Sequence, residues 1–454
     1  MLELFRSPRR AIVWFVEASL LALLGVSATG VLLGWADAFG GSHVLRVLLV
    51  SVVAQASMYY HGLYGPRPIR PAALVVGLLR ALVMAGAALA VLYHFLVPRA
   101  ALGRPVFVVA LSGAAVVLPA WRAAFHRLAS SSLCRRTALV LGGGPLGREC
   151  AALLAWDEGS GLHLAGVLIQ EGESPPPGVP VLGRYADVAR VAAAERVHRI
   201  VVATSERRGT LPVGELLDLK LGGVAIEEGI DFYERATGKI FVPALKPSDL
   251  VFAEGYRVRR APLVLKRAFD LAAAAVGLLL ALPILGLAAV AIKLDSPGPL
   301  LYAQERAGLY GRRFRVLKLR SMATDAERHG AVWAAEDDPR VTRVGRFLRR
   351  SRIDEVPQLW NVLVGEMSLV GPRPERPVFI AQLEREIPFF RQRLCMKPGI
   401  TGHAQVRCRY GASIDDAREK LSYDLFYIKR FSLWFDLSIL IDTVKVVLLR
   451  IGSR

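Results

Sequence analysis

The feature that most constrains this chain is a series of four apolar stretches near its amino terminus, separated by polar or proline-rich segments. They comprise residues 11–34, 44–63, 72–97 and 105–121. Each is close to the ~20 residues that a helix needs to cross the ~30 Å hydrocarbon core of a bilayer. The whole chain shares this bias, because 53% of its residues are hydrophobic and only 21% are charged. A soluble protein of this length needs more charged surface. We therefore expect residues 1–130 to form four transmembrane helices.

Basic residues indicate how these helices are oriented. Arginines precede the first stretch, separate the second from the third and follow the fourth, whereas the opposite loops contain few. The positive-inside rule therefore places both ends of the four-helix block in the cytoplasm. Glu17 and Arg46 are charged residues inside the first and second stretches. They either form an intramembrane functional site or, as their positions near helix ends favour, face a neighbouring helix or the lipid headgroups.

A fifth apolar run, residues 271–292, contains no charged residue but has Pro283 at its middle. It is long enough to cross a bilayer, yet proline interrupts helical hydrogen bonding and kinks a helix. A complete crossing would separate the soluble parts before and after it. Basic residues flank the run on both sides, which favours both ends at the same anionic cytoplasmic leaflet. We therefore predict a re-entrant helix over residues 268–293 that breaks at Pro283.

The middle of the chain has a pattern typical of dinucleotide-binding α/β domains. A β-rich run, residues 137–142, leads into a GxGxxG sequence and then into a helical pattern. The glycines of this sequence are Gly142, Gly144 and Gly147. Two more strands are expected, over residues 163–169 and 199–203. This spacing predicts a Rossmann-like module over residues 134–241.

Two interpretations of the glycine sequence remain open. The start of the helix after the glycines could hold the phosphate of a nucleotide or of NAD, or the glycines could serve only to pack that helix on the strand. The acidic residue expected after the second strand could be Glu171, but Gln170 occupies the more suitable position. This favours an inert or regulatory module. A segment without periodic pattern, residues 242–262, is predicted to be a linker.

The carboxy-terminal region is strongly basic in one part. Between Arg306 and Arg352 there are thirteen lysines and arginines and five acidic residues, and the whole chain has a formal net charge of +19. Such a segment can bind nucleic acid, anionic lipid or a sugar diphosphate. Its aromatic residues are not interleaved for base stacking. Because it lies beside predicted membrane helices, anionic lipid or nucleotide phosphate is the expected partner, and nucleic acid is not.

Adjacent carboxylates, Asp354 and Glu355, follow a cluster of arginines in this region and precede Pro357. Proline suits the first turn of a helix. We therefore expect both carboxylates at a helix N-terminus, where the helix dipole lowers their pKa values and keeps them ionised. One carboxylate could attack phosphorus while the other helps to hold a metal. The alternative is that Asp354 only caps the helix, and the spacing alone does not decide between the two.

Further motifs follow in order: GEMSLVGPRPE at residues 365–375, KPGITGHAQV at residues 397–406 and YDLFYIK at residues 423–429. Together with the preceding blocks, this order resembles the bacterial polyprenyl-phosphate sugar-1-phosphate transferases that initiate exopolysaccharide or O-antigen synthesis. The resemblance extends from about Lys266 to Asp442, and the amino-terminal layout is similar to that of the large members of the family. Residues 374–377 and 410–413 resemble the exopolysaccharide subgroup associated with PEP-CTERM sorting systems.

The resemblance implies a reaction and a set of site residues. The family transfers a sugar-1-phosphate from a UDP-sugar to undecaprenyl phosphate and releases UMP, through a covalent phosphosugar–aspartate intermediate. Asp354 matches the nucleophile, and Glu355 is its partner at a Mg²⁺ site. Pro283 matches the proline that breaks the re-entrant helix of the family. The residues expected to contact the substrates are Lys318, Arg320, Arg349, Arg352, Arg373 and Gln358.

The predicted architecture is therefore membrane α plus α/β. It comprises the four-helix transmembrane block, the Rossmann-like module and a mostly α-helical catalytic domain over residues 263–454 that contains the re-entrant helix. The family often has tryptophan where this chain has His403, and we expect a tolerated substitution rather than a new catalytic group. Residues 431–451 are apolar but carry several charges, which favours an interfacial amphipathic helix.

Two alternative functions follow from the same sequence. One is a membrane-anchored regulator or scaffold with an inactive transferase domain, which the intact Asp–Glu pair and basic blocks disfavour. The other is a nucleotide-sugar oxidoreductase or epimerase, but Tyr185 and Tyr233 have no lysine four residues further on. The expected partners are undecaprenyl phosphate, a UDP-sugar and anionic lipid of the bacterial inner membrane, with a second copy of the chain as a further candidate. The soluble domains are expected on the cytoplasmic side.

Overall fold

The computed structural model describes residues 8–64, 71–93, 103–129, 136–156, 162–204, 211–253, 255–256, 260–323, 340–408, 411 and 413–448. Parts of some predicted segments lie outside these residues: 94–97 of the third apolar stretch, 134–135, 157–161 and 205–210 of the Rossmann-like module, 254 and 257–259 of the linker, 324–339 of the basic segment, Tyr410 and Ala412 of the subgroup motif, and 449–454 at the end. The chain divides into two compact units, Met1–Ala236 and Thr237–Arg454.

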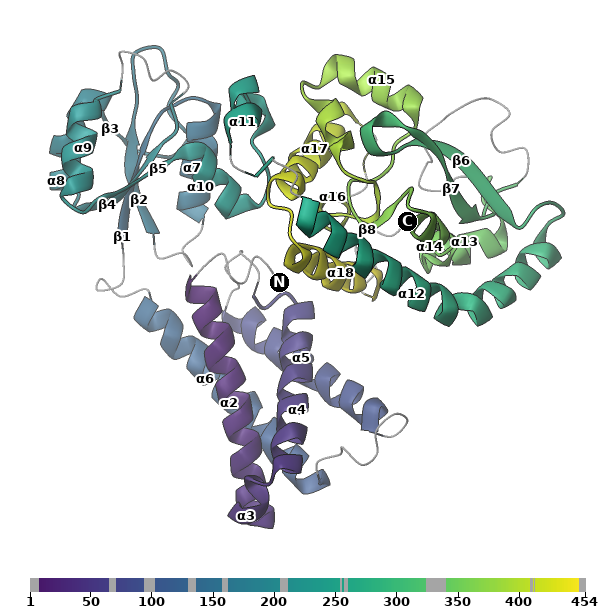
Figure 1. The fold of residues 1–454 in the computed structure, drawn as a ribbon. Helices are drawn as coiled ribbons and strands as arrows, with labels where there is room; N and C mark the ends of the chain where they lie inside the picture. Colours follow the sequence, from purple (N-terminus) through teal and green to yellow (C-terminus); the bar gives the residue numbers. More distant parts are fainter. Residues whose placement is uncertain are drawn as a thin grey trace. The chain divides into compact units, whose positions relative to one another are not determined.

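The four predicted apolar stretches form long helices that lie side by side (Figure 1). These are α2 (Pro8–Leu33), α4 (Gly41–Tyr60), α5 (Pro71–Val91) and α6 (Arg104–Ala129), with a short helix α3 (Trp35–Ala38) after the first. Each contains a segment that is long and apolar enough to cross a membrane. Small and medium apolar side chains form the buried core between these helices.

Glu17 of α2 is fully buried and faces neighbouring parts of the chain. Its carboxylate accepts a hydrogen bond from Arg122 Nε of α6 at 2.5 Å and another from the Tyr64 hydroxyl at 2.7 Å. Arg122 also donates to the carbonyl of Leu63 at 2.8 Å. A buried charge is tolerated when it is paired and hydrogen-bonded in this way. Glu17 therefore joins α2 to α6 and to the turn after α4, in agreement with the predicted contact to a neighbouring helix.

A five-stranded parallel sheet forms the predicted Rossmann-like module, with strand order β3-β2-β1-β4-β5 (Figure 1). The strands are β1 (Arg136–Leu141), β2 (Leu162–Leu168), β3 (Val181–Gly183), β4 (Val197–Val202) and β5 (Ala225–Glu228). Helices α8 (Val188–Ala194) and α9 (Val213–Leu221) cover one face, and α7 (Pro145–Trp156) and α10 (Gly229–Thr237) cover the other. The order is that of the first five strands of a doubly wound Rossmann sheet. The sequence pattern predicted β1, β2 and β4 but not β3 and β5, which have only three and four residues.

The glycine loop between β1 and α7 already has an acidic partner from its own chain. The Gly143 amide donates to the carboxylate of Glu173 at 3.1 Å, and the Gln170 amide donates to the same oxygen at 2.9 Å. Glu171, the residue named from the sequence, instead pairs with Arg184 at 3.1 Å. A side chain at Gly147 would collide with the backbone of Gly142, so this glycine is required for packing the helix on the strand. These contacts favour the inert or regulatory interpretation of the loop.

The second unit contains mostly helices around two small two-stranded sheets (Figure 1). Its helices are α11 (Pro247–Phe252), α12 (Arg260–Asp295), α13 (Arg343–Arg350), α14 (Gln358–Val364), α15 (Pro377–Glu386), α16 (His403–Arg407), α17 (Ile414–Lys429) and α18 (Leu433–Leu448). Strands β6 (Leu301–Ala307) and β7 (Arg313–Leu319) form an antiparallel hairpin, and β8 (Ser368–Val370) pairs with β9 (Gly399–Thr401) in parallel. Residues 237–241, which the sequence placed at the end of the Rossmann-like module, pack in this unit, because the Ile240 amide donates to the Ser422 carbonyl at 3.0 Å.

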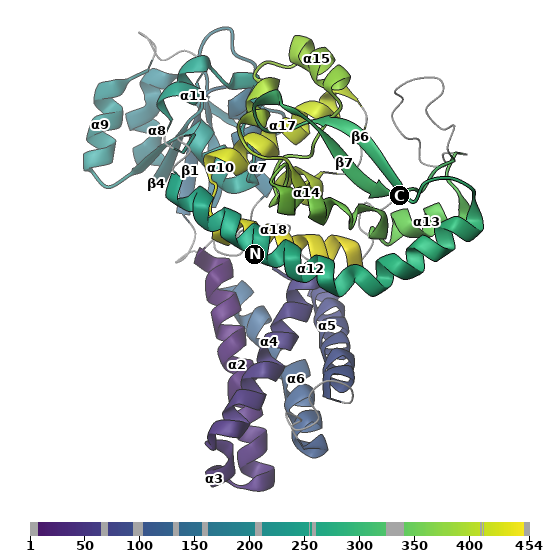
Figure 2. The ribbon, with the colours of Figure 1, turned by 45° about the vertical axis from the view of Figure 1, so that its right-hand side comes forward.

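Helix α12 continues through Pro283 without interruption and is 36 residues long. Its ribbon is bent (Figures 1 and 2), as expected for a helix that contains proline. It is the fifth helix of the described residues that could cross a membrane by length and composition. Apolar side chains such as Leu279, Leu280 and Leu287 are exposed on its surface. The re-entrant path over residues 268–293 stays a prediction.

A buried polar cluster anchors the first part of α12 to the rest of the unit. Lys266 of α12 contacts the Asp436 carboxylate of α18 at 2.5 Å. Asp436 also accepts a hydrogen bond from the Tyr427 hydroxyl of α17 at 2.7 Å. Asp270, one turn after Lys266, accepts a hydrogen bond from the Ser368 hydroxyl of β8 at 2.7 Å. The cluster thus fixes α12 to three elements that are distant in the sequence.

Candidate active site

The two adjacent carboxylates lie on a short 3₁₀ turn, Ile353–Glu355, between α13 and α14. Arg352, immediately before the turn, has a left-handed backbone with φ of 59°, which reverses the chain after α13. Helix α14 begins at Gln358 with Pro357 at its N-cap and no side-chain capping bond. The carboxylates therefore precede the helix instead of occupying its first turn, which excludes the alternative that Asp354 caps this helix.

Strand β7 positions Lys318 beside these carboxylates. Asn361 of α14 binds the backbone of β7, because its side chain accepts from the Leu317 amide at 3.0 Å and donates to the Arg315 carbonyl at 2.8 Å. These two hydrogen bonds replace the backbone hydrogen bonds that a neighbouring strand would make, and they fix the position of β7 along α14. Lys318, the next residue on β7, then places Nζ 3.1 Å from Glu355 Oε1.

We predict that Asn361→Ala lowers both stability and activity. The change leaves two half-buried backbone groups of β7 without their partners, which costs about 1–2 kcal/mol, and it releases the strand that carries Lys318. Thermal unfolding of the purified protein and the rate of the reaction proposed below measure the two effects. Gln382→Ala, at an exposed position of α15, is the control that should change neither. Full activity in Asn361→Ala would contradict this role.

Glu355 is surrounded by cations. Besides Lys318, its Oε1 lies 3.4 Å from Arg373 and 3.7 Å from Arg352. Burial raises the pKa of this carboxyl group, but the charges of Lys318, Arg373 and Arg352 together outweigh burial and hold the pKa well below its usual range. Glu355 is therefore ionised, and its carboxylate contacts cationic side chains from three different segments.

Asp354 has the opposite environment, although it is the next residue. Its side chain is buried, and its Oδ1 has no hydrogen-bond partner among the described residues. Burial and then the charge of Glu355 raise the pKa of Asp354 to about 6, despite the opposing effect of Lys318, Arg349 and Arg352. The predicted lowering of both pKa values by a helix dipole is therefore wrong for Asp354. A carboxylate oxygen without a hydrogen-bond partner, in a group near cations, is suited to act as a nucleophile.

The other predicted site residues have diverse surroundings. Arg349 of α13 donates from Nε to the Ser321 hydroxyl at 2.9 Å. Arg320 is buried and donates to the carbonyls of Ser296 and Pro297, each at 2.6 Å, near the end of α12. Arg320 therefore binds backbone carbonyls, whereas Lys318 binds the carboxylate of Glu355. Gln358 is buried in the first turn of α14.

His403 lies in a buried aromatic cluster of the second unit. Its Nε2 donates to the Gly238 carbonyl at 2.9 Å, and its ring centroid lies 5.1 Å from that of Tyr423 and 5.0 Å from that of Phe435. A histidine can replace a larger aromatic side chain here because both ring contacts and a hydrogen bond are available. These contacts describe a packing role, as expected for a tolerated substitution.

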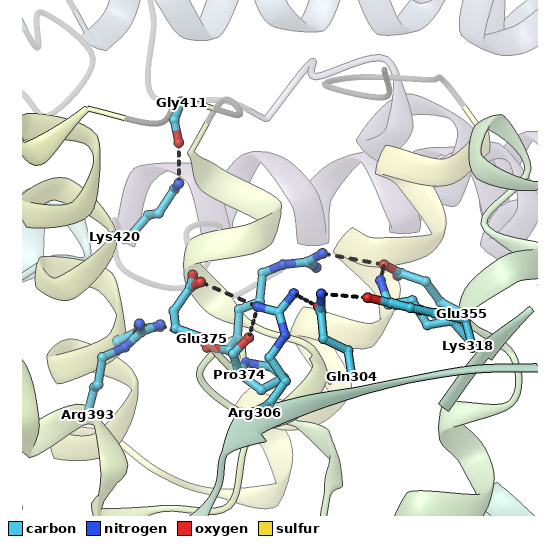
Figure 3. A network of polar contacts seen from close by, with 12 residues as sticks. Gln304, Arg306, Lys318, Glu355, Pro374, Glu375, Arg393, Gly411 and Lys420 are labelled. Carbon is cyan, nitrogen blue, oxygen red and sulfur yellow. Dashed lines mark hydrogen bonds and ion pairs between the residues drawn. The ribbon is translucent and has the colours of Figure 1, made fainter. Parts of the chain in front are cut away.

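A second layer of polar residues, which was not predicted from the sequence, contacts the segment that follows Arg373 (Figure 3). Arg306 of β6 donates to the Pro374 carbonyl at 3.1 Å and to the Gln304 side chain at 2.5 Å. It also lies 3.7 Å from the Glu375 carboxylate. Gln304 and Arg306 are two residues apart on a strand and therefore share a face. Their spacing in the sequence indicates that the two side chains lie on one face of a strand, but it does not indicate that this face contacts residues 374–375.

The described residues contain no group of three or more His, Cys, Asp or Glu side chains that could hold a metal. This does not suit a structural zinc site, which takes four protein ligands. Mg²⁺ differs, because it is commonly held by one or two carboxylates together with substrate phosphates and water. The unpartnered Asp354 Oδ1 and the adjacent Glu355 fit that smaller requirement.

The comparisons with known proteins concern this same part of the chain. Residues 261–450 match the family described as bacterial sugar transferase. The chain is 48% identical over 190 residues to a UDP-N-acetylgalactosamine-undecaprenyl-phosphate N-acetylgalactosaminephosphotransferase of Aeromonas hydrophila, covering 42% of this chain and 45% of that protein. It is 53% identical over 150 residues to a putative undecaprenyl-phosphate N-acetylgalactosaminyl 1-phosphate transferase of Bacillus subtilis, covering 33% of this chain and 80% of that protein.

A third relative is a UDP-glucose:undecaprenyl-phosphate glucose-1-phosphate transferase of Escherichia coli. It is 43% identical over 183 residues, which cover 40% of this chain and 39% of that protein. The matches thus span less than half of the Aeromonas and Escherichia proteins. The matched region contains the dyad Asp354–Glu355 and every basic residue around it. On this evidence the chain belongs to the bacterial polyprenyl-phosphate sugar-1-phosphate transferase family.

Proposed function

We propose that this protein transfers a sugar-1-phosphate from a UDP-sugar to undecaprenyl phosphate and releases UMP, as the first membrane step of exopolysaccharide synthesis. The observation that supports this most is the environment of Asp354. Its buried Oδ1 has no hydrogen-bond partner among the described residues, and the positive charges of Lys318, Arg349 and Arg352 partly offset the rise of its pKa by burial and Glu355. The relatives from Aeromonas hydrophila and Escherichia coli are named as transferases that use undecaprenyl phosphate, which supports the same reaction.

In the first half-reaction, an oxygen of Asp354 attacks the β-phosphorus of the UDP-sugar. The new bond joins the carboxylate to the phosphosugar, the bond between the β-phosphorus and the bridging oxygen breaks, and UMP leaves with the electron pair. Negative charge grows on the phosphoryl oxygens and on the leaving phosphate during this step. Lys318, Arg352 and Arg373, which Glu355 holds together, are the cations available to stabilise it.

In the second half-reaction, a phosphate oxygen of undecaprenyl phosphate attacks the phosphorus of the aspartyl intermediate. The bond to Asp354 breaks, so the free carboxylate is restored and the sugar leaves as a diphosphate-linked lipid. The apolar helices of the chain suit an acceptor that resides in a membrane. We propose that this membrane is the bacterial inner membrane and that the dyad lies on its cytoplasmic side.

We also propose that Mg²⁺ is required, with Asp354 and Glu355 as its protein ligands and phosphate oxygens completing the set. When bound, the ion would neutralise phosphate charge and orient the diphosphate. Glu355 is then shared between the ion and its three cations. We expect chelation of divalent ions to abolish UMP release and added Mg²⁺ to restore it.

The pH dependence of the first half-reaction follows from the raised pKa of Asp354. Only the ionised carboxylate attacks, and kcat/KM reports the chain before the donor and Mg²⁺ bind, so kcat/KM should fall about tenfold per pH unit below about pH 6. An ordinary aspartate would place this limb near pH 4. The acceptor phosphate itself titrates near pH 6. UMP release is therefore measured without acceptor, in a single turnover. A limb near pH 4 would contradict the proposed environment of the nucleophile.

The direct test of the function uses the full chain in nanodiscs. UMP release is measured with UDP-glucose, UDP-galactose, UDP-N-acetylglucosamine and UDP-N-acetylgalactosamine, with and without undecaprenyl phosphate. We expect one donor to give a single-turnover burst of UMP without acceptor and continuous release with it. Folded protein that releases UMP from no donor would contradict this function, and the regulator or scaffold alternative would then be favoured.

A further inference from the structure

The segment that carries Arg373 is held at its backbone by a buried ion pair. Arg393, in the 3₁₀ segment Phe390–Cys395, donates from Nη2 to the carbonyl oxygen of Arg373 at 3.1 Å. The same guanidinium contacts the Asp424 carboxylate of α17, with Nε at 3.0 Å and Nη2 at 2.7 Å. These contacts run continuously from Asp424 through Arg393 and Arg373 to Glu355.

Burial shows that the Arg393–Asp424 pair is not an ordinary surface ion pair. The side chains of Arg393 and Asp424 are only 5% and 2% exposed. Placing two charges in the interior carries a large desolvation cost, and surface pairs avoid that cost. The guanidinium also lies over the Phe390 ring, 5.1 Å from its centroid, which restricts its orientation. Arg393 can therefore present its Nη2 to the Arg373 carbonyl with little freedom to move.

The neighbouring peptides of this segment are held by other contacts. The Gly371 amide donates to the Thr401 carbonyl at 2.9 Å, and the Ala307 amide donates to the Glu375 carbonyl at 3.0 Å. Arg373 reaches Glu355 at 3.4 Å, which is long for a charge-assisted hydrogen bond. A small displacement of the Arg373 peptide would therefore separate the two side chains.

We propose that Arg393 and Asp424 are positioning residues for Arg373. This inference rests on the proposed function, in which Arg373 contacts the phosphates of the donor. Asp424 neutralises and orients Arg393, Arg393 holds the carbonyl of Arg373, and Arg373 is thereby kept at Glu355. Neither Arg393 nor Asp424 needs to touch the substrate. This role connects Asp424, in the motif at residues 423–429, with the dyad.

The test is a double-mutant cycle on the full chain in nanodiscs. Arg393→Lys keeps a cation beside Asp424 but lacks the forked guanidinium that contacts both Asp424 and the Arg373 carbonyl. We expect kcat/KM to fall roughly 10- to 100-fold, as for a displaced catalytic group. Arg373→Gln should lower it by at least as much. If Arg393 acts through Arg373, the double variant is no worse than Arg373→Gln alone. Losses that multiply in the double variant would overturn the proposal.

A matched pair of variants, Asp424→Asn as the test and Asp442→Asn as the control, separates positioning from general stability. Asp442→Asn removes the ion pair of Arg407 with Asp442, 3.2 Å apart in the same unit. It should leave kcat/KM within about threefold, whereas Asp424→Asn should lower kcat/KM beyond any loss that follows the fraction of folded protein. Equal losses in Asp424→Asn and Asp442→Asn at equal melting temperature would contradict the positioning role.

The same double-mutant cycle is also measured with the dissociation constant of UDP, which does not depend on turnover. If the wild-type chain releases no UMP, the proposed function fails, while non-additive losses of UDP affinity would still support the positioning role. If the wild-type chain turns over but both cycles are additive, the positioning role fails and the proposed function stands. The two failures are therefore distinguishable.

Discussion

Asp354→Asn should abolish UMP release and at the same time make the protein more stable at neutral pH. The loss of turnover should be on the order of 10³-fold or more, because the amide cannot form the covalent bond to phosphorus. The gain in stability follows from linkage. The pKa of Asp354 is raised to about 6 in the folded chain, above its ordinary value of about 3.9. The protonated form is therefore the one that folding favours, and stability is lost as the pH rises through this range.

At pH 7 the wild-type carboxylate is mostly ionised and carries that cost, whereas asparagine resembles the protonated form. The expected gain is about 3 kcal/mol at most, since one pKa unit corresponds to about 1.4 kcal/mol. Thermal unfolding in nanodiscs at pH 7 and pH 5 measures it, and the difference between variant and wild type should shrink at the lower pH. Asp415→Asn, at an exposed acidic residue, is the matched control. An active Asp354→Asn protein would refute the assignment of the nucleophile, and a destabilised one would contradict the raised pKa of Asp354.

Glu355→Gln should have the opposite effect on stability. The pKa of Glu355 lies well below its usual range, because Lys318, Arg373 and Arg352 outweigh the effect of burial. A carboxylate of this kind stabilises the fold at pH values above its ordinary pKa of about 4.3, and that stability is lost as the pH falls towards the folded-state pKa. The glutamine variant should therefore be less stable than the wild type at pH 7, and the difference should narrow below about pH 4.

The same substitution should lower activity and move its pH profile. Without the charge of Glu355, the three cations are no longer held at one point, and we expect UMP release to fall on the order of 100-fold. The charge of Glu355 also contributes to the raised pKa of Asp354, so the acid limb of the residual activity should shift below pH 6. Single-turnover UMP release between pH 4 and pH 8 measures both. A Glu355→Gln protein with an unchanged limb would contradict the electrostatic coupling of the pair.

Much of the architecture could be read from local pattern. Apolar stretches of membrane-spanning length became α2, α4, α5 and α6, and the β-rich runs became β1, β2 and β4. Short elements were missed, because three or four residues in β3 and β5 carry too little periodicity. The linker prediction did not foresee α11, a six-residue helix. Proline at position 283 indicated a kink, but the path of α12 depends on its neighbours.

By itself, the sequence determined the presence of the site: two adjacent carboxylates, the basic residues before them and the order of the later motifs establish the family. Only the tertiary structure decided what each residue contacts. Lys318 and Arg373 lie 37 and 18 residues from Glu355, yet both meet its carboxylate, whereas Arg320, two residues from Lys318, binds backbone carbonyls. Asp354 and Glu355 are chemically similar neighbours whose pKa values move in opposite directions. The reason is that burial and nearby charge arise from segments brought together by folding, and no local pattern records them.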